Sequence, residues 1–163
     1  MPAPLLFALP RLLLLAASLG PAPAGATSSP ADSASVVQAV EEYHAGLRAN
    51  APERVAAVLG PSFTMFNGNH SGDPHAWQAH LYLTGKDLAQ WPAAFLREAG
   101  PYENQVEVVR VHLRGDAALV VTEETGRNRF RRWQGELVTY FLGREHGGWR
   151  LVGFFIRDIA NPA

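Results

Sequence analysis

Cysteine is absent from this chain of 163 residues. The domain therefore has no disulfide bond and no thiolate nucleophile, and it has no cysteine at which a lipid could be attached after cleavage. Long apolar runs are scarce as well. The one apolar block lies near the N-terminus and is shorter than the roughly 18 residues that a membrane-spanning helix needs. We therefore expect a domain stabilised by packing alone.

A surplus of either charge is also missing. The chain has 14 Lys and Arg against 15 Asp and Glu, for a formal net charge of −1. Proteins that bind nucleic acid normally carry a strong basic surplus, so we expect no nucleic-acid partner. The sequence contains no glycine-rich phosphate loop, no nucleophile elbow and no Cys/His zinc pattern. We accordingly expect no cofactor.

The first 26 residues have the layout of a secretory signal peptide. Arg11 precedes the apolar segment 12–19, and the segment 20–26 then supplies helix breakers and two A-x-A cleavage patterns. A short uncleaved anchor is the alternative. We predict a signal peptide over 1–26, a Ser/Pro/Ala linker over 27–33 and one domain over 34–160. The heavy use of Ala, Arg, Gly and Pro is more typical of bacteria. Together with the signal peptide, this composition predicts a periplasmic or secreted protein with no other membrane contact.

Residues that favour β-structure dominate the second half of the chain. Short polar connections separate four such runs, and connections of this length suit antiparallel hairpins rather than parallel crossovers. The predicted strands are Val106–Arg114, Ala118–Gly126, Trp133–Arg144 and Trp149–Asp158. Both faces of the last run are apolar, which indicates a central strand or one that is covered on both sides.

Helical spacing dominates the first half. The predicted helices are Ala34–Ala49, Glu53–Leu59, Pro74–Gly85 and Leu88–Ala99, with a short strand over Ser62–Asn67. Within Pro74–Gly85 the segment His80–Leu83 fits an extended conformation equally well. Gly46 lowers helix propensity, which indicates that a neighbouring element approaches closely there. The predicted fold class is α+β, with a curved antiparallel sheet wrapped around N-terminal helices.

Three local patterns resemble those of one superfamily. They are the run 49–53 (Ala-Asn-Ala-Pro-Glu) followed by Val58, Leu59 and Phe63, the hairpin segment 115–120 and the closing segment 147–152 (Gly-Gly-Trp-Arg-Leu-Val). Together with the order of elements, they resemble nuclear transport factor two-like proteins, which include ketosteroid isomerases and SnoaL-like cyclases. The resemblance implies a cone-shaped, cystatin-like fold with an apolar pocket between sheet and helices. It does not carry over the catalytic Tyr and Asp of the isomerases, which align with no position here.

The pocket implied by this resemblance needs an acid or a base to be catalytic. His80 and Glu124 are the candidates for a proton shuttle, because a neutral imidazole or a carboxylate facing an apolar cavity can take a proton. The alternatives are a hydrogen-bonded structural histidine and a glutamate paired with an arginine. Six aromatic residues are predicted to line the pocket: Tyr43, Phe63, Trp77, Trp91, Tyr140 and Phe154.

Two further clusters each have a functional and a structural interpretation. The histidines His70, His75 and His80 are spaced by five residues, which does not suit a metal site on one helix, and no metal site is predicted. The arginines between 127 and 132 could bind an anion through their guanidinium groups or form a solvated hairpin tip.

The resulting functional hypothesis is an exported domain that binds a small apolar or carboxylate-bearing ligand. The first alternative is an isomerase, cyclase or dehydratase that uses His80 or Glu124. The second is a protein-interaction module without an open pocket. In each case the apolar outer face of the sheet predicts a homodimer, because covering each aromatic side chain stabilises the complex by about 2 kcal/mol.

Overall fold

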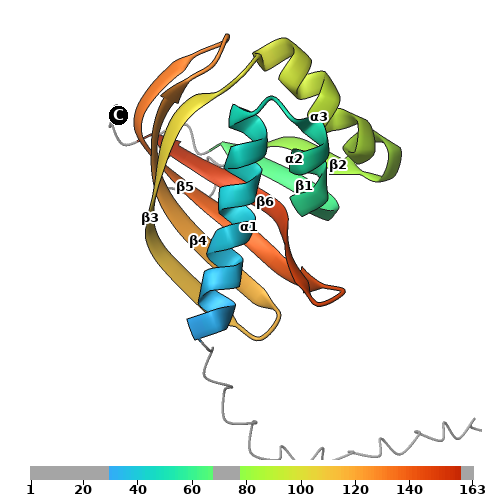
Figure 1. The fold of residues 1–163 in the computed structure, drawn as a ribbon, viewed down its shortest axis with the longest axis vertical. Coiled ribbons are helices and arrows are strands. Elements are labelled where there is room, and N and C mark those ends of the chain that lie inside the picture. The colour runs from blue at the N-terminus through green and yellow to red at the C-terminus, as the bar shows by residue number, and fades with distance from the viewer. Residues whose placement is uncertain (1–29, 68–77, 159–163) are drawn as a thin grey trace, which may run out of the picture.

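The computed structural model describes residues 30–67 and 78–158 (Figure 1). Three helices and six strands follow one another in the order α1 (Pro30–Arg48), α2 (Pro52–Val58), β1 (Leu59–Asn67), β2 (Gln78–Thr84), α3 (Gly85–Ala99), β3 (Glu103–Arg114), β4 (Ala117–Arg127), β5 (Arg132–Glu145) and β6 (Gly148–Asp158). The predicted residues His70, His75 and Trp77 lie outside the described residues.

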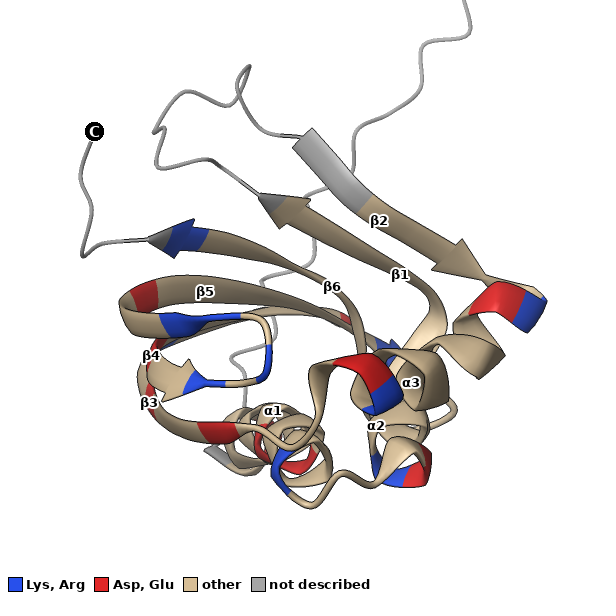
Figure 2. Ribbon diagram, turned by 90° about the horizontal axis from the view of Figure 1, so that it is seen from above, with Lys and Arg blue, Asp and Glu red and all other residues tan. Residues whose placement is uncertain are grey.

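One sheet contains all six strands, in the order β2-β1-β6-β5-β4-β3. The β1–β6 pair is parallel and every other pair is antiparallel. The sheet curls from β2 at one edge to β3 at the other, and the helices lie inside the curve (Figures 1 and 2). This arrangement confirms the predicted α+β class, and the position of β6 between β1 and β5 confirms that the last strand is central.

Helix α1 buries the apolar stripe that its spacing predicts. Val36, Val40, Tyr43 and Leu47 are each at most 3% exposed. The helix begins at Pro30 rather than at Ala34, which is compatible with the preference of proline for a first helical turn. No helix within the described ranges is both long enough and apolar enough to cross a bilayer.

Helices α1 and α2 approach each other closely at Gly46, as the sequence predicts. A Cβ atom at Gly46 would lie 2.8 Å from Cγ2 and 3.0 Å from the backbone nitrogen of Val55. The glycine therefore allows the short helix α2 to pack directly against α1.

The predicted helix over Pro74–Gly85 is wrong. The described part of that segment, from Gln78 to Thr84, forms the edge strand β2, which pairs with β1 in antiparallel register. Leu81 and Leu83 are partly buried whereas Tyr82 and Thr84 are exposed, which is the period of two of a strand. Pairing with β1 satisfies the backbone of this segment on one side, an effect that helical spacing alone does not reveal.

Alternation of buried and partly exposed side chains along β5 holds from Glu136 to Leu142 and fails before it. Trp133 and Glu136 are both buried, although their parity places them on opposite faces. The reason is an irregularity in the β4–β5 register between Glu124 and Gly126, opposite Gly135, which has a positive φ of 64°. The irregularity turns Trp133 toward the same side of the sheet as Glu136.

Candidate functional site

The concave face of the sheet and the helices enclose a cavity of about 280 Å³. Its wall combines side chains from α1, α3 and five strands with those of the β4–β5 connection. Eight of the described lining residues are aromatic: Tyr43, Trp91, Phe95, Tyr102, Phe130, Trp133, Tyr140 and Phe154. The polar groups are few, and most of them belong to two clusters, one around Glu124 and one around Glu136.

Contacts between rings connect these aromatic residues, apart from Phe130, into a continuous belt. Phe154 contacts Tyr43 and Tyr140 at centroid distances of 6.4 and 5.7 Å. On the α3 side Trp91 stacks on Phe95 at 4.8 Å. Further contacts, from Phe154 through Phe63 to Trp91 and from Phe95 through Tyr102 to Trp133, complete the belt. Such packing holds the wall in a defined shape.

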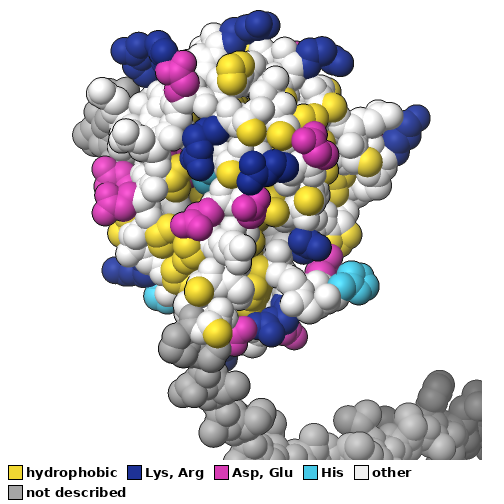
Figure 3. Space-filling model, in the orientation of Figure 1, with side chains coloured by type: hydrophobic (Ala, Val, Ile, Leu, Met, Phe, Trp, Pro, Cys, Tyr) yellow, Lys and Arg dark blue, Asp and Glu magenta, His cyan; other side chains and the backbone are white. Residues whose placement is uncertain are grey.

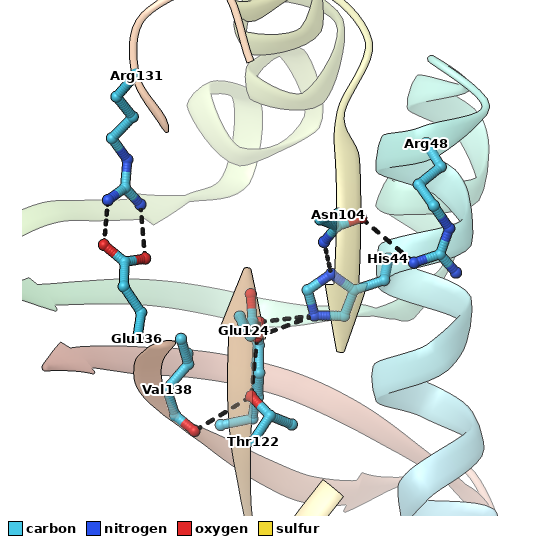
Figure 4. A network of polar contacts seen from close by, with 9 residues as sticks. His44, Arg48, Asn104, Thr122, Glu124, Arg131, Glu136 and Val138 are labelled. Atoms are coloured by element: carbon cyan, nitrogen blue, oxygen red, sulfur yellow. Dashed lines mark hydrogen bonds and ion pairs between the residues drawn. The ribbon is translucent and has the colours of Figure 1, made fainter. Parts of the chain in front are cut away.

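Glu124 is the buried carboxylate of the first cluster and is 5% exposed. Its position on β4 follows from alternation, because Ala118, Val120 and Thr122 on the same face are also buried. Its Oε1 atom accepts hydrogen bonds from Thr122 Oγ1 at 2.8 Å and from Tyr140 Oη at 2.7 Å. His44 Nε2 lies 3.3 Å from the same oxygen. Figure 4 shows these groups converging from α1 and the sheet.

The other carboxylate oxygen has a different environment. No described residue donates a hydrogen bond to Oε2 of Glu124. Within the described part of the chain, Oε2 is not a buried atom that lacks a hydrogen-bond partner. Glu124 lines the cavity, so Oε2 is the oxygen that a bound molecule can reach.

His44 connects this carboxylate to the outside of the fold. Its Nε2 atom lies 2.8 Å from Tyr140 Oη, and its Nδ1 atom lies 2.8 Å from Asn104 Nδ2. The guanidinium group of Arg48 can only donate, and it contacts Oδ1 of Asn104 at 3.3 Å. The amide nitrogen of Asn104 therefore donates to Nδ1, which leaves a neutral imidazole with its hydrogen on Nε2 (Figure 4).

The environment shifts the pKa values of the cluster in opposite directions. Burial acts to raise the pKa of Glu124, but hydrogen bonds from His44, Tyr140 and Thr122, and an imidazolium charge whenever His44 is protonated, bring it below its ordinary value. Burial, followed by the charge of Glu124, raises the pKa of Tyr140 well above the ordinary value. At neutral pH Glu124 is thus an acceptor and Tyr140 a donor.

The second cluster is an ion pair between Arg131 and Glu136. The carboxylate of Glu136 is 4% exposed, and both of its oxygens accept hydrogen bonds from the guanidinium group of Arg131. Arg131 also lies over the ring of Trp133, 4.8 Å from its centroid. The pair belongs to the cavity wall, but Arg131 itself is about half exposed.

The arginine run therefore divides into separate roles. Arg131 pairs with Glu136, and Arg127 pairs with the exposed Glu103. Figure 2 shows basic residues at the hairpin that joins β4 to β5. On the helix-covered face in Figure 3, charged side chains of both signs are interspersed.

The structure brings five of the predicted site residues to the cavity: Glu124, Tyr43, Trp91, Tyr140 and Phe154. Phe63 is fully buried between Trp91 and Phe154 and is not among the described lining residues. His80 lies in strand β2 and not in the helix that was predicted for this segment. The assigned roles remain predictions.

Four polar residues of the cavity were not predicted from the sequence as functional: His44, Asn104, Asn128 and Glu136. His44 had a usable signal, since it is the one histidine within the apolar stripe of α1. Asn104 and Glu136 had none, because their partners lie on other elements. Within 30–67 and 78–158 there is no group of three or more His, Asp or Glu side chains arranged to hold a metal ion.

Comparisons with known proteins give the fold but no close relative. No family model matches the chain, and no curated protein matches it. Solved structures do match. A candidate dehydratase of the NTF2-like family from Streptomyces avermitilis has a TM-score of 0.60 at 17% identity, over 79% of this chain and 96% of that one.

Two other structures agree. A ketosteroid isomerase-like protein from Erwinia carotovora atroseptica has a TM-score of 0.58 at 16% identity, over 82% of this chain and 100% of that one. A domain of unknown function with a cystatin-like fold, from Nostoc punctiforme, has a TM-score of 0.60 at 14% identity, over 80% and 78% of the two chains. The chain thus has the NTF2-like, cystatin-like fold that the sequence resemblance implies.

Proposed function

We propose that this chain is an exported small-molecule-binding domain of the SnoaL-like type. One observation carries the proposal: Glu124 holds one carboxylate oxygen in three polar contacts and leaves the other open to an aromatic cavity. The signal-peptide layout of residues 1–26 supports export.

The physical properties of the cavity favour a ligand. Small-molecule sites are concave and mostly apolar, with a few polar groups that fix orientation, and their volumes run from roughly 300 to 1,000 Å³. The cavity of about 280 Å³ lies just below that range. A compound with one aromatic or alicyclic ring would bury its apolar surface against the belt and direct a hydrogen-bond donor at Glu124. An open cavity also argues against the interaction module without a pocket.

Acid–base catalysis is the second candidate function. The observation that favours it is the mutual contact of a carboxylate, an imidazole and a phenol. Oε1 of Glu124 lies 3.3 Å from Nε2 of His44 and 2.7 Å from Oη of Tyr140, and the last two atoms are 2.8 Å apart. Isomerases and dehydratases need a base to accept a proton and an acid to return it. Here Glu124 would accept the proton at its open oxygen, Oε2, while Thr122 and Tyr140 hold Oε1 in place.

Tryptophan fluorescence tests the binding proposal. Trp91 and Trp133 line the cavity, whereas Trp149 is buried elsewhere and is covered by Arg144. We expect small aromatic compounds to change the emission of the wild-type chain and of Trp149→Phe, and most of this signal to be lost when Trp91 and Trp133 are both replaced by Phe. A panel of one-ring and two-ring compounds that leaves both the tryptophan emission and the melting temperature unchanged would contradict binding in this cavity. Turnover of a bound compound that disappears in Glu124→Gln would favour the catalytic alternative.

A further inference from the structure

Negative formal charges outnumber positive ones on the described wall of the cavity. Among the described lining residues, Glu124 and Glu136 are acidic, and Arg131 is the only Lys or Arg. His44 contributes no charge in the tautomer that its contact with Asn104 imposes. The described wall therefore has a net charge of −1 at neutral pH, and it has that charge in an apolar space where charges interact more strongly than in water.

The single cation of the wall is already engaged. Both oxygens of Glu136 accept from Arg131, and the guanidinium plane covers Trp133. A ligand carboxylate at Arg131 would have to share the guanidinium group with Glu136, whose carboxylate is 4% exposed, and would lie close to that negative charge. Like charges in an apolar space repel strongly, so the wall disfavours anionic ligands.

The uncompensated charge belongs to Glu124, which lines the same cavity as the aromatic belt. Tyr140 donates to Oε1, and its ring contacts those of Tyr43 and Phe154 at centroid distances of 6.1 and 5.7 Å. Aromatic faces attract a cation through their quadrupole when it lies within about 6 Å of the centroid. A cavity that holds both a carboxylate oxygen and several aromatic rings suits a cationic ligand.

We propose that the ligand of this cavity is a small organic cation, a protonated amine or a guanidinium group on a compact apolar body. Its N–H donates to Oε2 of Glu124, and its apolar body packs against the aromatic belt. This inference rests on the proposed binding function and narrows its ligand class. It also excludes the carboxylate-bearing ligand that the sequence suggests.

Three probes of similar shape and different charge test this ligand class: benzylamine, benzyl alcohol and benzoate. Their affinities are measured by isothermal titration calorimetry at pH 7 in sodium phosphate, because amine buffers would compete. We expect benzylamine to bind at least ten times more tightly than benzyl alcohol, and benzoate to bind more weakly than either. This comparison uses the wild-type chain and does not depend on any variant folding correctly.

A pair of variants then assigns the effect to one oxygen. Glu124→Gln keeps the shape and removes the charge, and Glu123→Gln makes the same change on the exposed neighbour in β4. We expect benzylamine to lose at least tenfold in affinity in Glu124→Gln and less than twofold in Glu123→Gln, with benzyl alcohol nearly unaffected in both. Thermal unfolding checks that both variants are folded.

The outcomes separate the two proposals. Equal affinity for all three probes, or tighter binding of benzoate, would overturn the cation inference and leave small-molecule binding intact. Loss of benzylamine affinity in Glu123→Gln to the same extent as in Glu124→Gln would show a general surface effect and would overturn it too. Absence of binding by every probe would count against the proposed function itself.

Discussion

Nδ1 of His44 accepts a hydrogen bond from Nδ2 of Asn104 across 2.8 Å, although the two residues are 60 positions apart. This contact fixes which ring nitrogen has the hydrogen and therefore the direction of every bond that follows toward Glu124. Arg48 fixes the amide in turn, through a contact of 3.3 Å with Oδ1 of Asn104. Arg48, at the exposed end of α1, thus determines the tautomer of His44 through Asn104.

Replacing this amide should change the tautomer of His44. In the wild-type chain we expect the Nε2–H form, because Nδ1 accepts from Asn104. In Asn104→Asp the new carboxylate can only accept at neutral pH, which favours hydrogen on both ring nitrogens. Long-range ¹H–¹⁵N NMR spectra of the His44 ring distinguish the two forms. The same ring spectrum in the wild type and in Asn104→Asp would contradict this assignment.

Glu124 should contribute to stability in a manner that depends on pH. Its carboxylate accepts from Thr122 and Tyr140, so Glu124→Gln disturbs buried donors, and we expect it to lower the free energy of unfolding by about 1–3 kcal/mol at pH 7. The exposed control Glu123→Gln should stay within about 0.5 kcal/mol. Urea unfolding followed by circular dichroism measures both.

The direction of the pH effect follows from linkage. The pKa of Glu124 in the folded chain lies below its ordinary value of 4.5. The group therefore stabilises the fold above the unfolded pKa, and this stabilisation is lost as pH falls through the folded pKa. The stability difference between wild type and Glu124→Gln should shrink between pH 5 and pH 3. A difference that grows on acidification would reverse the assigned direction of the shift.

A comparison of two ion pairs tests the importance of burial. Arg131 pairs with the buried Glu136, whereas Arg127 pairs with Glu103, whose side chain is 64% exposed. We expect Arg131→Met to cost about 1–3 kcal/mol of unfolding free energy, because it removes a partner from a buried carboxylate. Solvent around the half-exposed guanidinium keeps this below the cost for a fully buried pair. Arg127→Met should cost at most about 1 kcal/mol.

The same unfolding measurements, repeated at high salt, separate the two pairs further. Salt screens the exposed pair strongly and the buried one weakly. The cost of Arg131→Met should therefore persist in 0.5 M NaCl. Equal costs for the two variants at both salt concentrations would show that burial of Glu136 does not matter.

Gly46 should tolerate no side chain. Alanine has a helix propensity that is better by up to about 1 kcal/mol, but its Cβ would lie 3.0 Å from the backbone nitrogen of Val55. A backbone atom cannot rotate away, so α2 would have to shift, and we expect Gly46→Ala to lower the free energy of unfolding by about 1–3 kcal/mol. Gly143→Ala is the control, since its Cβ would meet only Val152 at 3.7 Å. A stabilised Gly46→Ala would contradict the close approach of the two helices.

Alternation along strands predicted much of the cavity wall but could not predict its polar connections. Alternation along β4 puts Glu123 and Glu124 on opposite faces, so it predicted one inward carboxylate without deciding which, and the structure buries Glu124. Helical spacing placed Tyr43 on the apolar stripe that α1 buries. Asn104 depends on how closely β3 approaches α1, and Trp133 depends on the irregularity at Gly135. These are tertiary relationships that leave no periodic signal in the sequence.

Strand β2 shows the same limit at the level of an element. Its residues fit helical and extended spacing about equally, and pairing with β1 decides between them. β1 itself pairs in parallel with β6, which follows it by about ninety residues, and no local pattern encodes that pairing. The hairpins β3–β4, β4–β5 and β5–β6 were predictable because each is closed by a short turn.

The outer face of the sheet supports the last prediction, a homodimer. The register places Leu119 of β4 beside Phe141 of β5, and the next row places Val121 beside Thr139. Leu119 is 38% exposed, which is high for a leucine on a strand that lies inside the sheet. A second copy packed on this face would bury these side chains, and each apolar side chain so covered would stabilise the dimer by about 2 kcal/mol.

Light scattering coupled to size-exclusion chromatography tests the dimer at micromolar concentration with the chain after residue 26. We expect the mass of a dimer for the wild type and that of a monomer for Leu119→Arg, because a buried guanidinium group without a partner opposes association. Gln90→Arg adds the same charge on the exposed surface of α3, on the opposite side of the molecule from that face, and should remain dimeric. A monomeric wild type would contradict the prediction directly. A Leu119→Arg variant that still has the dimer mass would mean that the two copies meet through another surface.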